Sequence, residues 1–247
     1  MAASQTVSEM TSSRRGDGDE AAVAGLRSYA RLAGIGLLVA LASIIAVYAG
    51  SGAIAGTRPD NATDAAAVSA FYNHSELAFF FWQAVISAMA IAFFALAFRR
   101  YLHGFAHRPV VRQLADFGIA LALIETPVVV VEFGVQISLV RLAGLGDPSL
   151  LGVFMAWNWI DNGTMLILEP AWLAFLSLAA WMSGALPRWL AAYGGLVSLL
   201  LFVLAVPGLM LHYPLGIALG AYGPFMVWFL VTGIYLARGG RAPVAES

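Results

Sequence analysis

The sequence predicts an all-α protein, a polytopic bundle of six transmembrane helices with both termini in the cytoplasm. Three observations predict this fold. Of the 247 residues, 61% are hydrophobic and only 11% are charged, whereas soluble domains are about 45–50% apolar and about 25% charged. Six apolar stretches each reach the length of about 20 residues that a helix needs to cross a bilayer. Arginine residues gather on one side of these stretches.

The six predicted spans follow one another within a helical domain over residues 29–240. They cover roughly 30–50, 76–98, 115–140, 152–183, 189–211 and 216–237. The fourth stretch is long enough to include a short interfacial helix near 150–158. Residues 1–28 mix charges with Ser, Ala and Gly, so we expect a flexible polar cytoplasmic tail there. Residues 241–247 are expected to form a second, short cytoplasmic tail.

The distribution of arginine sets the expected orientation. With the N-terminus inside, eleven arginines fall in cytoplasmic segments and only Arg58 and Arg141 fall in outer segments. This bias follows the positive-inside rule across all six spans. The chain has no Lys but is rich in Ala, Gly and Arg, which is typical of a GC-rich bacterial genome. We therefore expect a multi-pass protein of a bacterial cytoplasmic membrane.

The composition excludes several classes of function. The chain has no Cys, so disulfides, thiolate catalysis and Cys-ligated zinc or iron–sulfur clusters are excluded. A net charge of −1 argues against nucleic-acid binding, which needs a basic surface. His74 and His212 are the only candidates for metal ligation with the acids, and they follow no metal-binding motif. The sequence thus predicts no metal and no cofactor, and it leaves the oligomeric state open.

Four carboxylates fall inside the predicted spans, at Glu125, Glu132, Asp161 and Glu169. An acid at the centre of a membrane helix costs about 2.5–3.5 kcal/mol on translocon scales, so such residues suggest a functional site. No basic residue lies deep enough in the predicted spans to pair with them. The acids are therefore expected either to be protonated or to hold a cation.

Helical spacing places polar residues in a line on each of three predicted spans. The lines contain Glu76, Gln83 and Ser87; Glu125, Glu132 and Gln136; and Asn158, Asn162 and Glu169. Asp161 and Trp157 lie beside the third line, and Trp82 lies beside the first. If the lines face one another, they form an acidic pocket in the outer half of the bilayer, with Trp157 and Trp82 as its aromatic wall.

This arrangement is compatible with three functions. The first is the binding of a lipophilic or cationic small molecule, for transport or sensing, by the acids and their polar and aromatic neighbours. The second is an acid–base enzyme of isomerase or cyclase type that acts on an isoprenoid or lipid, with Glu125, Glu169 and Asp161 as catalytic residues. The third is a structural or accessory membrane subunit, in which the polar groups hydrogen-bond the helices together.

Several short segments resemble a bacterial family of six-helix integral membrane proteins that carries a domain of unknown function. The most specific is the Leu186-Pro187-Arg188-Trp189-Leu190 turn between the fourth and fifth spans. The others are Tyr29-Ala30-Arg31-Leu32-Ala33-Gly34, the central Leu123-Ile124-Glu125-Thr126, and Trp228 followed by Tyr235-Leu236-Ala237-Arg238-Gly239. The resemblance covers most of residues 29–240 and implies a fold and a membrane location. Family members often carry an acid in the last span, where this chain has Phe225-Met226-Val227.

Overall fold

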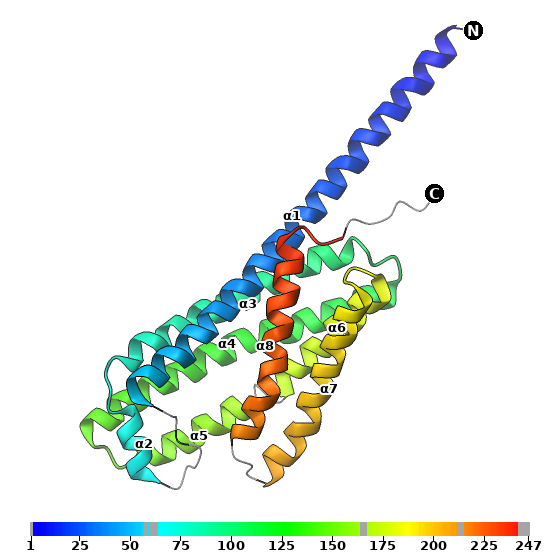
Figure 1. The fold of residues 1–247 in the computed structure, drawn as a ribbon. Coiled ribbons are helices and arrows are strands. Elements are labelled where there is room, and N and C mark those ends of the chain that lie inside the picture. The colour runs from blue at the N-terminus through cyan, green and yellow to red at the C-terminus, as the bar shows by residue number, and fades with distance from the viewer. Residues whose placement is uncertain (1, 57–58, 60–63, 164–166, 212–214, 242–247) are drawn as a thin grey trace.

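The computed structural model describes residues 2–56, 59, 64–163, 167–211 and 215–241 (Figure 1). Within these ranges the chain forms helices and no strand. The all-helical fold class is therefore confirmed. The helices are α1 (Ala2–Ala55), α2 (Ala65–Tyr72), α3 (Leu77–His103), α4 (Pro109–Leu145), α5 (Leu150–Gly163), α6 (Glu169–Ser183), α7 (Arg188–Leu211) and α8 (Leu215–Ala237).

Three of these helices contain segments that are long and apolar enough to cross a membrane, at Ala22–Ala55, Leu77–His103 and Pro109–Leu145. Their outward faces carry large apolar side chains. Phe79, Met89 and Val131 are each more than half exposed. A water-facing surface rarely carries apolar area of this extent, whereas lipid tails solvate it well. The composition of the outer surface thus agrees with a membrane location.

The first helix is longer than the sequence predicts. Residues 2–28, expected as a flexible tail, are helical and run on into the first apolar segment, so α1 projects well beyond the bundle (Figure 1). Once a helix is nucleated, adding residues to it is cheap, and the first proline of the chain is Pro59. Nothing in the preceding sequence therefore forces the helix to begin later.

The fourth predicted span, 152–183, is divided in the structure. α5 covers the region where a short helix was expected, and α6 begins only at Glu169. Residues 167–168 form a π-helical turn immediately before α6. Pro170 follows at the start of α6 and cannot donate a backbone hydrogen bond. A π-helical turn thus lies directly beside one of the candidate acids, and such turns occur often at functional sites.

A tight turn connects α4 to α5. Gly146 ends α4 with a φ of 65°, a left-handed conformation that glycine adopts without strain. The backbone N–H and the hydroxyl of Ser149 both donate to Oδ1 of Asp147, at 2.8 and 2.7 Å. These bonds hold the pKa of the Asp147 carboxyl below its usual range. The turn reverses the chain, so that α5 returns along α4.

Helix α1 lies between α3 and α8, and small residues allow the close approach (Figure 1). A Cβ atom added to Gly34 would come within 2.2 Å of the backbone nitrogen of Ala237 and 2.6 Å of the carbonyl oxygen of Gly233. The backbones of α1 and α8 therefore touch at this crossing. Glycine allows such contact between membrane helices, where packing replaces the hydrophobic effect.

One end of the bundle holds most of the described arginines, and we call it the arginine-rich end. It is formed by the C-terminal ends of α3, α6 and α8 and the N-terminal ends of α4 and α7. The Tyr101 hydroxyl connects these segments. It lies 3.0 Å from the carbonyl oxygen of Ala185 and 3.2 Å from that of Arg241, and it accepts a bond of 2.9 Å from the Arg241 N–H.

Five aromatic rings from three helices pack together in the middle of the bundle, and we call them the aromatic layer. They are Phe94, Trp172, Phe225, Trp228 and Phe229. Trp172 contacts all four of the others, with ring centroids 5.8 to 6.4 Å apart. Each of the five side chains is at most 1% exposed. This layer separates the arginine-rich end from the candidate site.

Candidate functional site

A pocket lies next to the aromatic layer, on the side away from the arginine-rich end. It encloses about 520 Å³ of empty space, a volume that includes open solvent at its mouth. Five helices contribute to its wall. Its polar and aromatic lining is Tyr48, Ser87, Glu125, Glu132, Phe133, Glu169 and Tyr222, and its apolar lining is Ile44, Val47, Ala84, Ile91 and Val129.

Glu125 reaches the pocket from the middle of α4. Its side chain is only 1% exposed. The indole N–H of Trp172, on α6, donates a hydrogen bond to Oε2 of Glu125. The second oxygen, Oε1, is buried and has no hydrogen-bond partner among the described residues. Glu125 is thus held on one side by the aromatic layer and keeps one acceptor in the pocket wall.

Glu169 has the same arrangement on the neighbouring helix. It is the first residue of α6, next to the π-helical turn, and is 6% exposed. The hydroxyl of Tyr222, on α8, donates to Oε1 of Glu169. Within the described part of the chain, no group donates to the buried Oε2. The hydroxyl of Ser198 donates to the carbonyl oxygen of Pro170 at 2.7 Å, which fixes the start of α6 against α7.

The acids act on one another electrostatically. The negative charges of Glu125 and of Asp161 both repel a charge on Glu169. Glu132 adds a third carboxyl to the pocket wall. None of the described residues that line the pocket is basic. In a low-dielectric interior this repulsion is strong, so the pocket favours either protons or a bound positive charge.

The structure brings together the acids that the sequence singled out on two of the three lines. Glu125 and Glu132 are seven residues apart on α4, and both face the pocket with Glu169 and Ser87. Asp161, on α5, is buried and close enough to act on Glu169, but it does not line the pocket. The spacing on α4 thus places two acids on one face of the helix, as expected.

The expected aromatic wall requires correction. Trp82 is 64% exposed on the outer face of α3 and lies outside the pocket. Trp157 is fully buried but does not line the pocket. It packs against Phe154, with ring centroids 5.5 Å apart, in a cluster of side chains from α1, α2, α3, α4 and α5. The rings that line the pocket are instead those of Tyr48, Phe133 and Tyr222.

The other expected ligand-binding residues also lie outside the pocket lining. Glu76 is exposed immediately before α3. Gln83 is half-buried and does not line the pocket, because the α3 residues that line it are Ala84, Ser87 and Ile91. Gln136 is buried one turn beyond Glu132, and Asn158 is half-buried on α5. The side chain of Asn162, like His212, lies outside the described part of the chain.

Sequence reasoning missed the two donors of the site. Tyr222 lies in an apolar predicted span without a polar neighbour in helical register, so nothing in the pattern marked it. Trp172 lies three residues after Glu169, on the adjacent turn of the same helix, and this spacing was the available signal. Each donor lies on a different helix from the acid that it binds. Trp172 of α6 donates to Glu125 of α4, and Tyr222 of α8 donates to Glu169 of α6.

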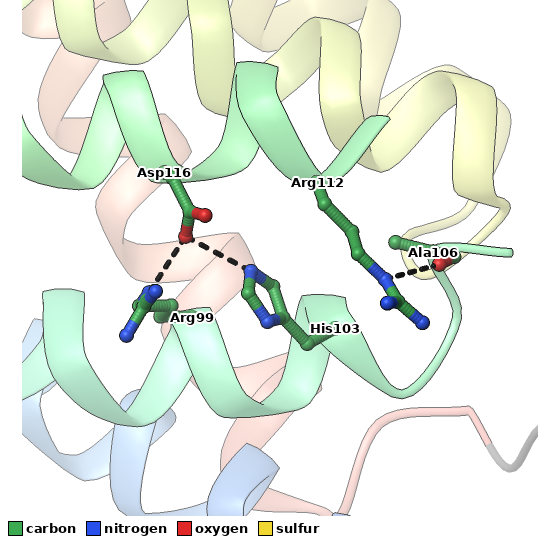
Figure 2. A network of polar contacts seen from close by, with 5 residues as sticks. All are labelled: Arg99, His103, Ala106, Arg112 and Asp116. Atoms are coloured by element: carbon green, nitrogen blue, oxygen red, sulfur yellow. Dashed lines mark hydrogen bonds and ion pairs between the residues drawn. The ribbon is translucent and has the colours of Figure 1, made fainter. Parts of the chain in front are cut away.

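A second polar cluster lies at the arginine-rich end (Figure 2). Asp116, on α4, accepts hydrogen bonds on Oδ1 from Nε of Arg99 at 2.6 Å and from Nε2 of His103 at 2.9 Å, both on α3. Nearby, Nε of Arg112 donates to the carbonyl oxygen of Ala106 in the connecting loop at 2.9 Å. The cluster joins two consecutive helices and is separate from the acidic pocket.

We expect the Asp116→Asn variant to lose little stability. The side chains of Arg99 and Asp116 are each 42% exposed, and ion pairs with such exposure contribute about 0–1 kcal/mol. Thermal unfolding of the purified protein in detergent, at low and at high salt, measures the effect. The difference from the wild-type protein should be small and should shrink further at high salt. A large loss of stability at both salt concentrations would contradict this assignment.

The fold and the site define an all-helical protein in which helices of membrane-spanning length surround a buried, acidic pocket. Comparisons with protein-family models, with curated proteins and with solved structures find no match for this chain. The chemistry of the pocket is therefore the basis for a functional proposal.

Proposed function

We propose that the chain is a six-span protein of a bacterial inner membrane, and that its acidic pocket binds a lipophilic or cationic small molecule for transport or sensing. The observation that carries the proposal is the pair of Glu125 and Glu169. They lie on neighbouring helices in one pocket, and each is buried with one oxygen that no described residue binds. Unpartnered acceptors in a buried pocket are costly, and a bound cation offsets that cost.

The membrane topology in this proposal uses α1, α3 and α4 as three spans. Helices α7 and α8 contain shorter apolar segments, Arg188–Val203 and Tyr222–Ala237, and would form two more. The interrupted pair α5 and α6 would form the sixth. The arginine-rich end then faces the cytoplasm, in agreement with the positive-inside rule, and the pocket opens in the outer half of the bilayer.

The lining supports a ligand with one positive charge and an apolar body. The carboxyls of Glu125 and Glu169 supply the negative charge. The rings of Tyr48, Phe133 and Tyr222 supply faces on which a cation is stabilised. Five aliphatic residues of the wall match a hydrocarbon tail, namely Ile44, Val47, Ala84, Ile91 and Val129. Hexyltrimethylammonium has this chemistry and serves as the probe, and n-hexanol serves as its neutral counterpart.

The test measures binding of both compounds to the purified protein in detergent by titration calorimetry. Hexyltrimethylammonium should bind at least about tenfold more tightly than n-hexanol, because only the cation interacts with the acids. Glu125→Gln and Glu169→Gln should each weaken binding of the cation at least about tenfold and leave binding of n-hexanol unchanged. Glutamine still accepts from Trp172 or Tyr222, so both variants should fold.

Asp116→Asn is the matched control, because it removes a carboxylate from α4 outside the pocket. It should bind the cation as the wild-type protein does. Equal affinity for the cation and for n-hexanol would contradict the proposal. The same is true if the two pocket variants and the control bind the cation alike.

One observation favours the acid–base alternative. The Tyr222 hydroxyl donates a hydrogen bond to the Glu169 carboxyl in the pocket wall. A phenol and a carboxyl in contact can pass a proton to a lipid or isoprenoid substrate. An enzyme would show turnover that Glu169→Gln abolishes while substrate binding remains. A binding protein would instead lose affinity in that variant.

A further inference from the structure

We infer that the Glu125–Glu169 pair is an exchange site, in which the pocket releases one proton for each monovalent cation that it binds. This inference rests on the proposed function, because it specifies how the same pocket accepts its ligand. It adds that the release of one proton compensates the positive charge of each bound cation. The empty pair is neutral, and the pair together with its bound cation is neutral as well.

Burial and mutual repulsion set the charge of the two acids in the empty pocket. Glu125 and Glu169 are almost fully buried, and a charge on one repels a charge on the other. Their donors, the indole of Trp172 and the phenol of Tyr222, are neutral hydrogen-bond donors. A buried carboxylate without a counter-charge costs several kcal/mol. Protonation of both acids is therefore the stable state of the empty pocket.

Among the described residues, four other titratable groups face the pair. On α4 the pair is joined by Glu132, on α5 by Asp161, on α8 by Tyr222 and on α1 by Tyr48. Asp161 and Glu132 also interact with other groups. The pocket lining contributed by α3 consists of Ala84, Ser87 and Ile91. All the titratable groups in this set are acidic, so none of them supplies a positive charge.

Binding of a cation changes the charge of the pair. A cation that enters the pocket brings one positive charge next to the two acids. One carboxyl then gives up its proton to water, and its carboxylate pairs with the cation. One positive charge enters and one leaves, so no uncompensated charge is buried. The second acid keeps its proton, because ionising both would restore the repulsion between them.

The experiment counts protons. Hexyltrimethylammonium carries a fixed charge, so any proton released on binding comes from the protein. Calorimetric titrations at one pH, in buffers that differ in ionisation enthalpy, give the number of protons released per bound cation. We expect about one. Where the empty pair is protonated, affinity should also strengthen about tenfold for each unit by which the pH rises.

Two variants sharpen the test. Asp116→Asn should release one proton per cation, as the wild-type protein does, because its lost carboxyl lies outside the pocket. The double variant Glu125→Gln, Glu169→Gln should bind the cation no better than n-hexanol and should release no proton. The single variants each retain one acid and should release one proton at lower affinity.

The outcomes separate the exchange from the proposed function. Tight binding of the cation without proton release, and with an affinity that does not change with pH, would overturn the exchange and leave the binding function intact. Failure of the cation to bind more tightly than n-hexanol would overturn both. Release of a proton from the double variant would also overturn the assignment, because the proton would then come from another group.

Discussion

Gly34→Ala is expected to break the packing of α1 against α8. The new methyl group would lie 2.2 Å from the backbone nitrogen of Ala237 and 2.8 Å from its Cα atom. These are backbone atoms, so rotation of a side chain cannot relieve the overlap, and the two helices must separate. Overpacking of this kind typically costs about 1–3 kcal/mol and sometimes more, and we expect a value at the upper end of that range.

The matched control is Gly52→Ala on the same helix, where an added Cβ atom meets no neighbour within 4 Å. In that open position alanine should stabilise the helix by up to about 1 kcal/mol. Unfolding of both variants by denaturing detergent, followed by the helical circular dichroism signal, compares them directly. If Gly34→Ala is as stable as Gly52→Ala, the close crossing of α1 and α8 is wrong.

Replacing Trp172 is the second change with a large expected effect. The side chain is fully buried, contacts the four other rings of the aromatic layer and donates to Glu125. Trp172→Ala should cost about 3–5 kcal/mol, because it removes a large side chain from a close-packed interior. Trp172→Phe keeps a ring and removes the donor, which leaves a buried acceptor unpaired at a cost of about 1–3 kcal/mol.

The two Trp172 variants separate packing from hydrogen bonding in one unfolding experiment. Combining Trp172→Phe with Glu125→Leu, which removes the acceptor, completes a double-mutant cycle, and the coupling energy reports the bond itself. A Trp172→Phe variant as stable as the wild-type protein would show that the bond contributes nothing. An equal loss in the Phe and Ala variants would assign the whole effect to the hydrogen bond.

Part of the site follows from helical geometry alone. Glu125 and Glu132 are separated by nearly two turns, so they must share a face of α4 whatever the rest of the fold does. Acidic side chains inside a membrane protein avoid lipid, so Glu125 and Glu132 were expected to lie in the bundle interior together with Glu169. The structure places all three in one pocket.

Other parts of the site depend on tertiary packing, which periodicity does not determine. Trp82 and Gln83 lie on α3, yet periodicity cannot say which side of α3 meets α1 and α4. The structure turns Ser87 inward and Trp82 outward. Tyr222 enters the site only because α8 crosses beside α6, a contact between residues 53 positions apart in the chain. The π-helical turn before α6 could not be predicted from the sequence either, because Pro170 is compatible with either a kink or a break.

Among the described residues, the aromatic layer closes the end of the pocket that holds Glu125. An ion or proton that reaches Glu125 is separated from the arginine-rich end by packed rings, and one of them, Trp172, donates to Glu125 itself. In the proposed orientation, a ligand could move from the pocket toward the arginine-rich end only after these rings separate.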